Sequence, residues 1–384
     1  MIKTNVCIVG SGPAGASTSL MLSKLKIAHF IIDKAVFPRD KTCGDGLILH
    51  AYKSLKILGL LEKFLKHPKF IHSKKIKLHI KDKLNIQFRE SEEREMVISY
   101  GKRIYFDEFL VKEFSEKYTT CEFGNAVKKL EEVSEGIIIT LKDGKQILTK
   151  VIVGADGIQS LVSKKLTNYK PDKSKMSTFI SAYFKNVALM PLDNEAEIRL
   201  YYKKMPLFFY LFPLPNNEVN VTLGGNTKSL LKNDINLKKE VLSILESNAD
   251  VAFKFKKAEQ IGSWRGWGIP YHYKQQKVCG NRFLLVGDAA GLANAFYKEG
   301  VGTGMMSGII CAQKIANCIR EDNFSSEFML SYKKDLDKEF SKMLIVSEFA
   351  LKMTAFKGMF RGFVKFSKKI IEKKAVKMIK SRSY

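Results

Sequence analysis

The feature that most constrains the fold is a glycine-rich turn near the start of the chain, Gly10-Ser11-Gly12-Pro13-Ala14-Gly15. It follows an apolar run rich in β-branched residues, Ile2–Val9, and it opens a helical stretch from Pro13 to about Lys26. Ala28–Asp33 then has the pattern of a second strand. A strand, a helix and a second strand in this order form a β-α-β unit with two parallel strands. We therefore predict an α/β fold whose first domain is Rossmann-like.

The three glycines of this turn have separate roles. Gly10 permits the tight turn, Gly12 lets the backbone approach a pyrophosphate, and Gly15 lets the helix pack closely on the strand. Asp33 ends the second strand, where its carboxylate can accept hydrogen bonds from ribose hydroxyls. A glycine-rich turn without a ligand has the same pattern, and the turn does not separate FAD from NAD. The residues predicted to bind the dinucleotide here are Gly10, Gly12, Pro13, Ala14, Gly15, Asp33 and Lys34.

Three further glycine-rich motifs point to a flavin. Gly154-Ala155-Asp156-Gly157 and Gly287-Asp288-Ala289-Ala290-Gly291 each follow an apolar strand, and Gly300-Val301-Gly302-Thr303-Gly304 opens a long helix. Asp288 is placed to hold ribityl hydroxyls, and the helix N–H groups can stabilise negative charge on a reduced flavin. Each motif alone is typical of an ordinary turn, but their order along the chain predicts FAD. The predicted FAD-binding residues in these motifs are Asp156, Gly157, Gly287, Asp288, Gly300, Val301 and Gly302.

The remaining pattern predicts a discontinuous domain with an insertion. Alternating segments between residues 176 and 265, and a hairpin at 75–80 and 84–89, predict one mostly antiparallel sheet. Residues 106–117 are predicted to be helical, and residues 127–153 to form three strands. We expect an FAD-binding domain of residues 1–70, 100–165 and 278–325, a substrate domain of residues 71–99 and 166–277, and a C-terminal helical, basic segment of residues 326–384.

The charge of the chain favours an acidic partner. Lys and Arg number 65 and Asp and Glu 39, a net charge of +26. Residues 352–384 hold eleven basic residues and one acid, Glu372, with apolar residues at helical spacing. This pattern predicts binding to an anionic membrane surface rather than to nucleic acid, although a packed helix with solvated lysines has the same pattern.

The cysteines and histidines predict neither a cluster nor a metal site. No pair of the six cysteines has CxxC spacing, and the six histidines are scattered. We expect a reduced, cytoplasmic protein, because the chain begins directly with a strand and has no apolar run of about twenty residues. It would lie in solution or on the inner face of the membrane.

Several stretches resemble the geranylgeranyl reductase family within the group-A flavoprotein monooxygenase fold. Pro38-Arg39-Asp40-Lys41-Thr42-Cys43-Gly44-Asp45-Gly46-Leu47 is similar to its P-x4-C-G-x-G/A-L signature, and Arg103-Ile104-Tyr105-Phe106-Asp107 to its RxxFD element. The segments 208–213 and 287–300 resemble its YxWxFP and GDAAG-x-x-N-P-F-x-x-E-G elements. The resemblance spans about residues 1–305. It implies FAD contacts from Cys43, Gly44, Arg103 and Ala126, with Cys43 and Gly44 as catalytic residues. It also implies a substrate wall of Phe208, Tyr210, Phe212, Pro213, Trp267, Phe296 and Tyr297.

The chain departs from these patterns in ways that bear on the reaction. Ala295 stands where the family has proline, and Tyr297 and Lys298 replace small residues. Aromatic hydroxylases of the superfamily carry histidine directly after GDAA, where this chain has Gly291. Trp264 and Trp267 resemble the halogenase WxWxIP motif, but their spacing differs by one and we expect them to pack the inserted sheet.

The expected function is reduction of carbon–carbon double bonds in a hydrophobic, isoprenoid lipid, with NADPH or a ferredoxin-type carrier as reductant. Two alternatives stay open. One is a flavin monooxygenase or halogenase that acts on an aromatic or lipid-linked substrate. The other is a flavoprotein that passes electrons to a quinone. Cys43 is either a proton donor or a small residue that fills a tight loop.

Overall fold

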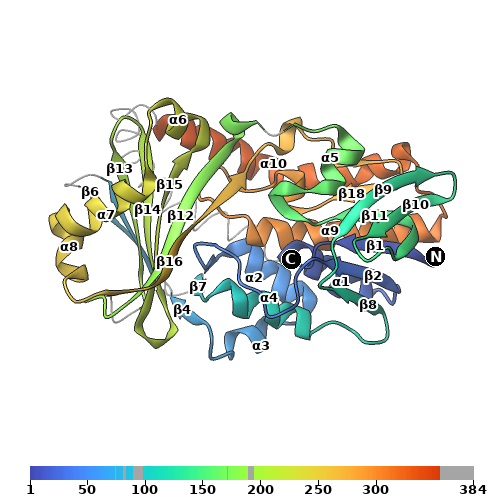
Figure 1. Cartoon of the computed structure of the whole chain (residues 1–384), viewed down its shortest axis with the longest axis horizontal. Helices are drawn as coiled ribbons and strands as arrows, with labels where there is room; N and C mark the ends of the chain where they lie inside the picture. The colour runs from blue at the N-terminus through green and yellow to red at the C-terminus, as the bar shows by residue number, and fades with distance from the viewer. Residues whose placement is uncertain (74, 81–83, 90–97, 171, 189–193, 355–384) are drawn as a thin grey trace.

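The computed structural model describes residues 1–73, 98–170, 172–188 and 194–354 in full, and the strands β5 (Lys75–Ile80) and β6 (Leu84–Arg89) as backbone. Most of the predicted basic tail, residues 355–384, lies outside the described residues. The chain forms two lobes side by side, each built on its own sheet (Figure 1). No helix among the residues described is both long and apolar enough to cross a membrane.

The sheet of the first lobe is mostly parallel. Its strand order is β17-β18-β11-β1-β2-β8, and the hairpin strands β10 and β9 continue from β11. β1 lies in its middle and pairs in parallel with β11 and β2, as the β-α-β pattern predicts. The strands are β1 (Ile2–Val9), β2 (His29–Asp33), β8 (Thr119–Phe123), β9 (Val127–Val133), β10 (Gly136–Leu141), β11 (Gln146–Gly154), β17 (Cys279–Gly280) and β18 (Phe283–Leu285).

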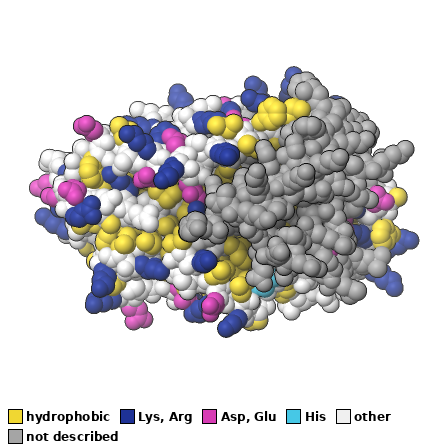
Figure 2. Space-filling view, turned by 180° about the vertical axis from the view of Figure 1, so that it is seen from behind, with side chains coloured by type: hydrophobic (Ala, Val, Ile, Leu, Met, Phe, Trp, Pro, Cys, Tyr) yellow, Lys and Arg dark blue, Asp and Glu magenta, His cyan; other side chains and the backbone are white. Residues whose placement is uncertain are grey.

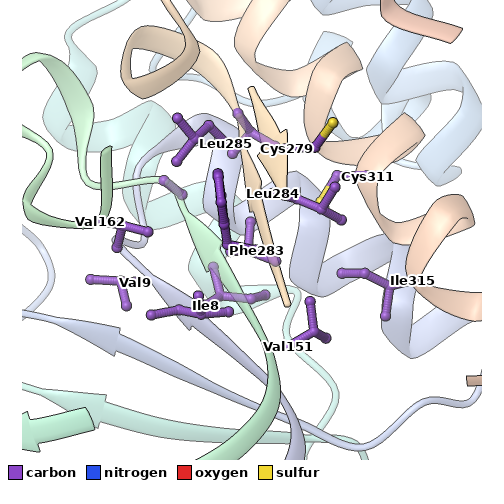
Figure 3. Close-up of a cluster of buried hydrophobic side chains, with 14 of the residues drawn as sticks. Ile8, Val9, Val151, Val162, Cys279, Phe283, Leu284, Leu285, Cys311 and Ile315 are labelled. Atoms are coloured by element: carbon purple, nitrogen blue, oxygen red, sulfur yellow. The ribbon is translucent and has the colours of Figure 1, made fainter. Parts of the chain in front are cut away.

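Helices cover this sheet and close its core. α1 (Pro13–Lys24) packs on α9 (Val301–Arg320) so closely that a Cβ atom added at Gly308 would lie 2.4 Å from the carbonyl oxygen of Ala14. α10 (Ser326–Thr354) runs from this lobe to the second lobe, and α5 (Leu161–Thr167) follows β11 (Figure 1). Apolar side chains from β1, β11 and β18 meet those of α9 in one buried cluster, which includes Cys279 and Cys311 (Figure 3).

The sheet of the second lobe is antiparallel except where β13 pairs in parallel with β5. Its order is β16-β12-β15-β14-β13-β5-β6. One face packs on three short helices, and the other face turns toward the first lobe. The remaining elements of this lobe are β12 (Met176–Lys185), β13 (Ala196–Tyr202), β14 (Pro206–Leu214), β15 (Glu218–Asn226), β16 (Glu259–Pro270), α6 (Thr227–Lys232), α7 (Leu237–Ser247) and α8 (Ala249–Phe255). The predicted mixed fold, a Rossmann-like sheet with an inserted antiparallel sheet, is confirmed.

A small third sheet, β3-β7-β4, lies at the boundary between the lobes. Its strands are β3 (Gly46–Leu47), β4 (Ile71–Ser73) and β7 (Ile98–Tyr100), and the neighbouring helices are α2 (Leu49–Leu58), α3 (Leu61–Leu65) and α4 (Arg103–Lys112). The prediction of a helix over residues 106–117 was wrong at both ends. α4 begins at Arg103, because the Arg103–Asp107 ion pair joins adjacent turns, and it ends at Lys112 before an irregular turn.

Candidate functional site

The first glycine-rich turn is a rigid cradle between β1 and α1. Gly10 has φ +100°, and a Cβ atom there would lie 2.4 Å from the carbonyl oxygen of Ala155. At Gly15 an added Cβ would lie 1.8 Å from the carbonyl oxygen of Gly10, so the helix touches the turn directly. Asp33 fixes the turn by accepting a hydrogen bond from the Ser11 N–H at 2.7 Å. Its other carboxylate oxygen accepts from the Ala35 N–H at 2.9 Å, so both oxygens of this carboxylate hold backbone N–H groups.

Gly12 differs from Gly10 and Gly15, because the atom nearest to an added Cβ belongs to a cationic side chain rather than to the backbone. Among the residues described, the one atom within 4 Å of that Cβ is Nη2 of Arg39, at 3.4 Å. Arg39 also pairs with Asp107, Nη2 to Oδ2, at 3.0 Å. A guanidinium beside the amino end of a helix suits a pyrophosphate. The sequence analysis did not assign Arg39 to the site, although it lies within the quoted signature stretch.

Asp156 and Gly157 lie where β11 ends, next to Gly10. Asp156 Oδ2 accepts hydrogen bonds from the N–H groups of Leu161, at 2.6 Å, and Val162, at 3.3 Å, while its Oδ1 is buried with no partner among the described residues. Burial raises the pKa of Asp156. Gly157 has φ +74° and open space on its Cβ side. This corner therefore holds an unsatisfied oxygen close to the cradle.

Asp288 and Gly300 bring two separate motifs together. A Cβ atom at Gly300 would lie 3.2 Å from Oδ1 of Asp288, so the turn after β18 meets the amino end of α9. Burial raises the pKa of Asp288, and the positive charges of Lys41 and Arg103 oppose that shift. Gly287 has φ +57°, and an added Cβ there would lie 2.9 Å from Cβ of Ala14 in α1.

The amino end of α9 already faces a carboxylate. The Gly302 and Thr303 N–H groups bond to Glu299, and burial raises the pKa of Glu299 to about 7 against that effect. A Cβ atom at Gly302 would also lie 2.5 Å from the Ala51 backbone nitrogen. Gly302 is thus required for packing on α2, whatever its N–H group contributes to a ligand. Val301, beside it, contacts the buried cluster of α1, α2 and α4.

The signature loop Cys43–Gly44 is held from both lobes. Burial raises the pKa of the Cys43 thiol, while the nearby Arg103 guanidinium lowers it. Arg103 itself forms a bidentate pair with Asp107, with distances of 2.8 and 2.9 Å. From the second lobe, Asn220 of β15 donates to the Cys43 carbonyl oxygen at 2.9 Å.

A buried polar network continues from this loop into the second sheet. Asp45 Oδ2 accepts from Asn220 Nδ2 at 2.7 Å and from the Tyr183 hydroxyl at 2.8 Å, and Oδ1 accepts from the Arg103 N–H at 3.2 Å. Ser181 and Thr222 both donate to the amide oxygen of Asn220. Burial raises the pKa of Asp45 to about 6 against these hydrogen bonds. Asn220, Tyr183 and Asp45 were not among the predicted site residues.

The predicted substrate residues of β14 form a continuous aromatic wall. Phe208, Tyr210 and Phe212 share one face of the strand, and their rings stack at centroid distances of 6.5 Å and 5.4 Å. Tyr100 extends the stack at 5.6 Å from Phe212. We call these four residues the aromatic wall. Phe296 packs edge-on against Phe208 at 6.0 Å, and Trp267 joins through Phe179, which lies 6.0 Å from Tyr210 and 5.7 Å from Trp267.

Other predicted residues do not come to this wall. Pro213 alternates to the opposite face of β14, where Leu211 packs against the helices. Tyr297 is 62% exposed and contacts Phe296.

Two residues predicted to bind the cofactor, and a tryptophan of the second sheet, have other surroundings. Lys34 is exposed beyond Asp33, and Ala126 accepts a hydrogen bond from the Lys142 N–H just before β9. Trp264 packs with Phe184 on the helix-covered face, so the two tryptophans lie on opposite faces of β16.

His272 occupies the space that a side chain at position 291 would need. Gly291 has φ +67°, and an added Cβ would lie 2.7 Å from Cδ2 of His272. The imidazole stacks on Tyr169 at 4.2 Å, and burial lowers the pKa of His272 to about 4. The ring is therefore neutral at physiological pH. A side chain at position 291 would have to displace the His272 ring.

A family profile that describes an FAD binding domain matches residues 3–343 of this chain. The chain belongs to this family. It is an FAD-dependent oxidoreductase. The match to this family profile confirms FAD, the cofactor that the glycine-rich motifs predict.

The FAD binding domain protein is similar over most of its length to several known proteins. A geranylgeranyl bacteriochlorophyll reductase-like protein of Thermoplasma acidophilum shares its fold, with a TM-score of 0.82, 18% identity, and coverage of 94% of this chain and 90% of that one. The flavin-dependent brominase Bmp2 shares it with a TM-score of 0.78, 19% identity and coverage of 96% and 92%. The digeranylgeranylglycerophospholipid reductase of Methanococcus vannielii is 25% identical over 355 residues, which cover 89% of this chain and 84% of the relative.

The residues present fit FAD. The space beside Gly12 is open except for a guanidinium, Asp156 has an unpaired buried oxygen, and the Asp288 carboxylate meets the glycine at the amino end of α9. Pyrophosphate would lie at Gly12 and Arg39, ribityl hydroxyls at Asp288, and the ring between the Cys43–Gly44 loop and Gly300. This assignment joins segments from five parts of the chain into one site.

Proposed function

We propose that this protein reduces carbon–carbon double bonds in a hydrophobic, isoprenoid lipid. The observation that carries the proposal is the contact between the aromatic wall and the signature loop. A Cβ atom at Gly44 would lie 3.0 Å from the Phe212 ring, so an apolar chain on the wall would lie beside the loop assigned to the flavin. Such a wall of stacked rings binds an extended hydrocarbon through area and shape rather than through hydrogen bonds. The likeness to reductases of geranylgeranyl lipids supports this choice.

FAD, once reduced, supplies a hydride to one alkene carbon, and the other carbon takes a proton. The chain contributes the rest. Tyr210 is 6% exposed and Phe208 5%, so these rings of the wall lie away from bulk water. The Asp45 carboxyl and the Tyr183 hydroxyl form a hydrogen-bonded pair that can hold a proton behind the Cys43–Gly44 loop. The Arg103 guanidinium lies near the Cys43 thiol on the same side.

A reductase fits this site better than an aromatic hydroxylase. This chain has Gly291 where hydroxylases carry histidine, and the His272 ring occupies the space beside that glycine. Halogenase chemistry is the second candidate, because the brominase has the same fold. Against it, Trp264 and Trp267 lie on opposite faces of β16 and do not form a paired motif. The reductant would be NADPH or a ferredoxin-type carrier, and the enzyme would work in the cytoplasm at an anionic membrane surface.

Anaerobic reoxidation tests the proposal. The holoenzyme is reduced with one equivalent of dithionite and mixed with geranylgeraniol or, as a control, the fully saturated alcohol. We expect the flavin absorbance to recover with an unsaturated lipid alone and the product mass to rise by two for each reduced bond. Hydroxylated or halogenated product under oxygen and halide, without any saturated product, would favour the second candidate instead.

A further inference from the structure

Lys298 places a cation at one end of the aromatic wall. It lies on the loop between β18 and α9, and Nζ donates to the Ser177 hydroxyl at 3.0 Å and to the Ala295 carbonyl oxygen. The ammonium stands over two rings, at 5.4 Å from the Phe208 centroid and 5.0 Å from the Tyr271 centroid. Its surroundings are therefore neutral oxygen atoms and aromatic faces.

The charge of this ammonium is not balanced. Among the residues that the structure describes, no carboxylate lies within 4.0 Å of Nζ; the neighbouring carboxylate of Glu348 pairs with Lys175 at 3.7 Å. Burial lowers the pKa of Lys298 to about 7, with no charged group opposing the shift. An ammonium has three N–H donors, and the two acceptors named above use two of them. A partly buried cation with a spare donor gains from an anion, because the anion offsets the cost of its desolvation.

The position of Lys298 defines what such an anion would belong to. Phe208 lies under the ammonium, and the wall continues from Phe208 to Phe212 over four residues of strand, or about 13 Å. The far end meets Gly44 of the signature loop. A molecule with an anionic head at Lys298 and an apolar chain along the wall would place carbon atoms remote from its head beside Cys43 and Gly44.

We propose that Lys298 binds the anionic head group, a phosphate or a carboxylate, of an amphipathic substrate whose hydrocarbon chain lies along the aromatic wall. This inference rests on the proposed function, because it assumes that the wall binds the lipid. It makes the head group a specificity element, since neutral prenyl alcohols lack the ion pair. It also assigns a role to a residue that departs from the small side chain found in the family.

Calorimetric titration of the FAD-loaded full-length protein tests the head-group site at Lys298 separately from lipid binding by the aromatic wall. The ligands are geranyl phosphate, geranic acid and neutral geraniol, which share one chain. We expect at least one anion to bind tenfold or more tightly than geraniol, and the phosphate and carboxylate arms show which head group is preferred. Lys298→Met removes the charge at similar length and should abolish this preference without weakening geraniol, whereas Lys298→Arg should keep it. Lys204→Met, at an exposed lysine on the β13–β14 turn, is the matched control.

The outcomes distinguish the proposals. Equal binding of geraniol and both anions, or an equal loss for all three ligands in Lys298→Met, would overturn the head-group site and leave the lipid wall standing. Failure of all three ligands to bind the unmodified protein would overturn both the wall as a lipid site and the role of Lys298.

Discussion

Gly44 and Phe212 are in direct contact across the two lobes: a Cβ atom added at Gly44 would lie 3.0 Å from Cε2 of Phe212. The loop assigned to the flavin and the wall assigned to the substrate therefore share one surface. Asn220 strengthens this junction by donating to both the Cys43 carbonyl and the Asp45 carboxylate. A change on either side of the contact should alter how a substrate lies against the cofactor.

Gly44→Ala tests the junction. We expect FAD binding to persist and lipid turnover to fall by about tenfold, because overpacking of this kind costs roughly 1–3 kcal/mol. Gly46→Ala is the matched control, since its added Cβ would meet the Phe212 ring at an ordinary 3.9 Å. Phe212→Leu in the Gly44→Ala background should restore part of the turnover. Equal turnover by the two alanine variants would show that this contact does not position the substrate.

Gly12→Val tests the phosphate cradle separately from folding. Among the residues described, the added Cβ meets only the flexible Arg39 side chain, so the apoprotein should keep its melting temperature while FAD binding is lost. Gly15→Ala is the contrasting variant, because its Cβ would collide with the Gly10 carbonyl and should destabilise the apoprotein itself. Thermal unfolding with and without added FAD measures both effects. FAD binding by Gly12→Val at normal affinity would rule out this turn as the pyrophosphate site.

Arg39→Met should weaken FAD binding by about ten- to a hundredfold, since a charged hydrogen bond is worth roughly 1.5–3 kcal/mol. Arg265→Met is the control, because the Arg265 side chain is 58% exposed and its partner is the exposed Asp40. Titration of apoprotein with FAD, followed by flavin fluorescence, gives both dissociation constants. The assignment fails if the two variants bind FAD equally well.

Asp45→Asn should change how stability depends on pH. The folded pKa of about 6 exceeds the ordinary value of 3.8, so the folded state holds its proton longer than the unfolded state. Stability should therefore decrease as pH rises from about 4 to about 6, by up to about 3 kcal/mol, and this component should be constant above pH 6. Asn tolerates the φ of +62° at this position, and its amide does not titrate. The difference between the two denaturant-unfolding profiles should show this step; parallel profiles would contradict it.

Membrane binding tests the proposed location of the enzyme. The described part of α10 reaches Thr354, whose carbonyl accepts from the Tyr202 hydroxyl, and Leu351 packs against the wall cluster, so a shortened chain should keep residues up to Thr354. Liposome sedimentation should show binding of the full chain to anionic vesicles, weaker at high salt, at about 1 kcal/mol per basic residue near the surface. Ile345 and Val346 of α10 are exposed and would add an apolar contact. Undiminished binding by the shortened chain would exclude residues 355–384 as the anchor.

The described surface does not by itself identify a membrane face. Lys and Arg side chains are scattered among acidic and apolar ones over the described part of one side of the molecule (Figure 2). The sedimentation experiment therefore compares neutral with anionic vesicles as well as the two chain lengths. Binding to both kinds of vesicle alike would contradict an electrostatic contribution.

The sequence by itself determined the elements and the cofactor, because those signals are local. The first turn of glycines marks β1, α1 and β2, since the positive φ of Gly10 and the contact of Gly15 with the Gly10 carbonyl oxygen both arise within the turn. Alternation of apolar residues predicted the hairpin and the antiparallel sheet for the same reason, as a strand buries every second side chain. The aromatic wall was also visible, because Phe208, Tyr210 and Phe212 share one face of one strand.

Tertiary structure alone decided which distant groups meet. Asp45 lies 138 residues from Tyr183 and 175 from Asn220, and Lys298 lies 121 residues from Ser177, so no spacing pattern links them. The approach of His272 to Gly291 and of Arg39 to Gly12 depends on how loops from different elements fold back on one another. Local periodicity determines which face of a strand or helix is buried. Which partner covers that face, and hence which carboxyl or lysine is left buried beside the substrate wall, depends on the packing of the whole chain.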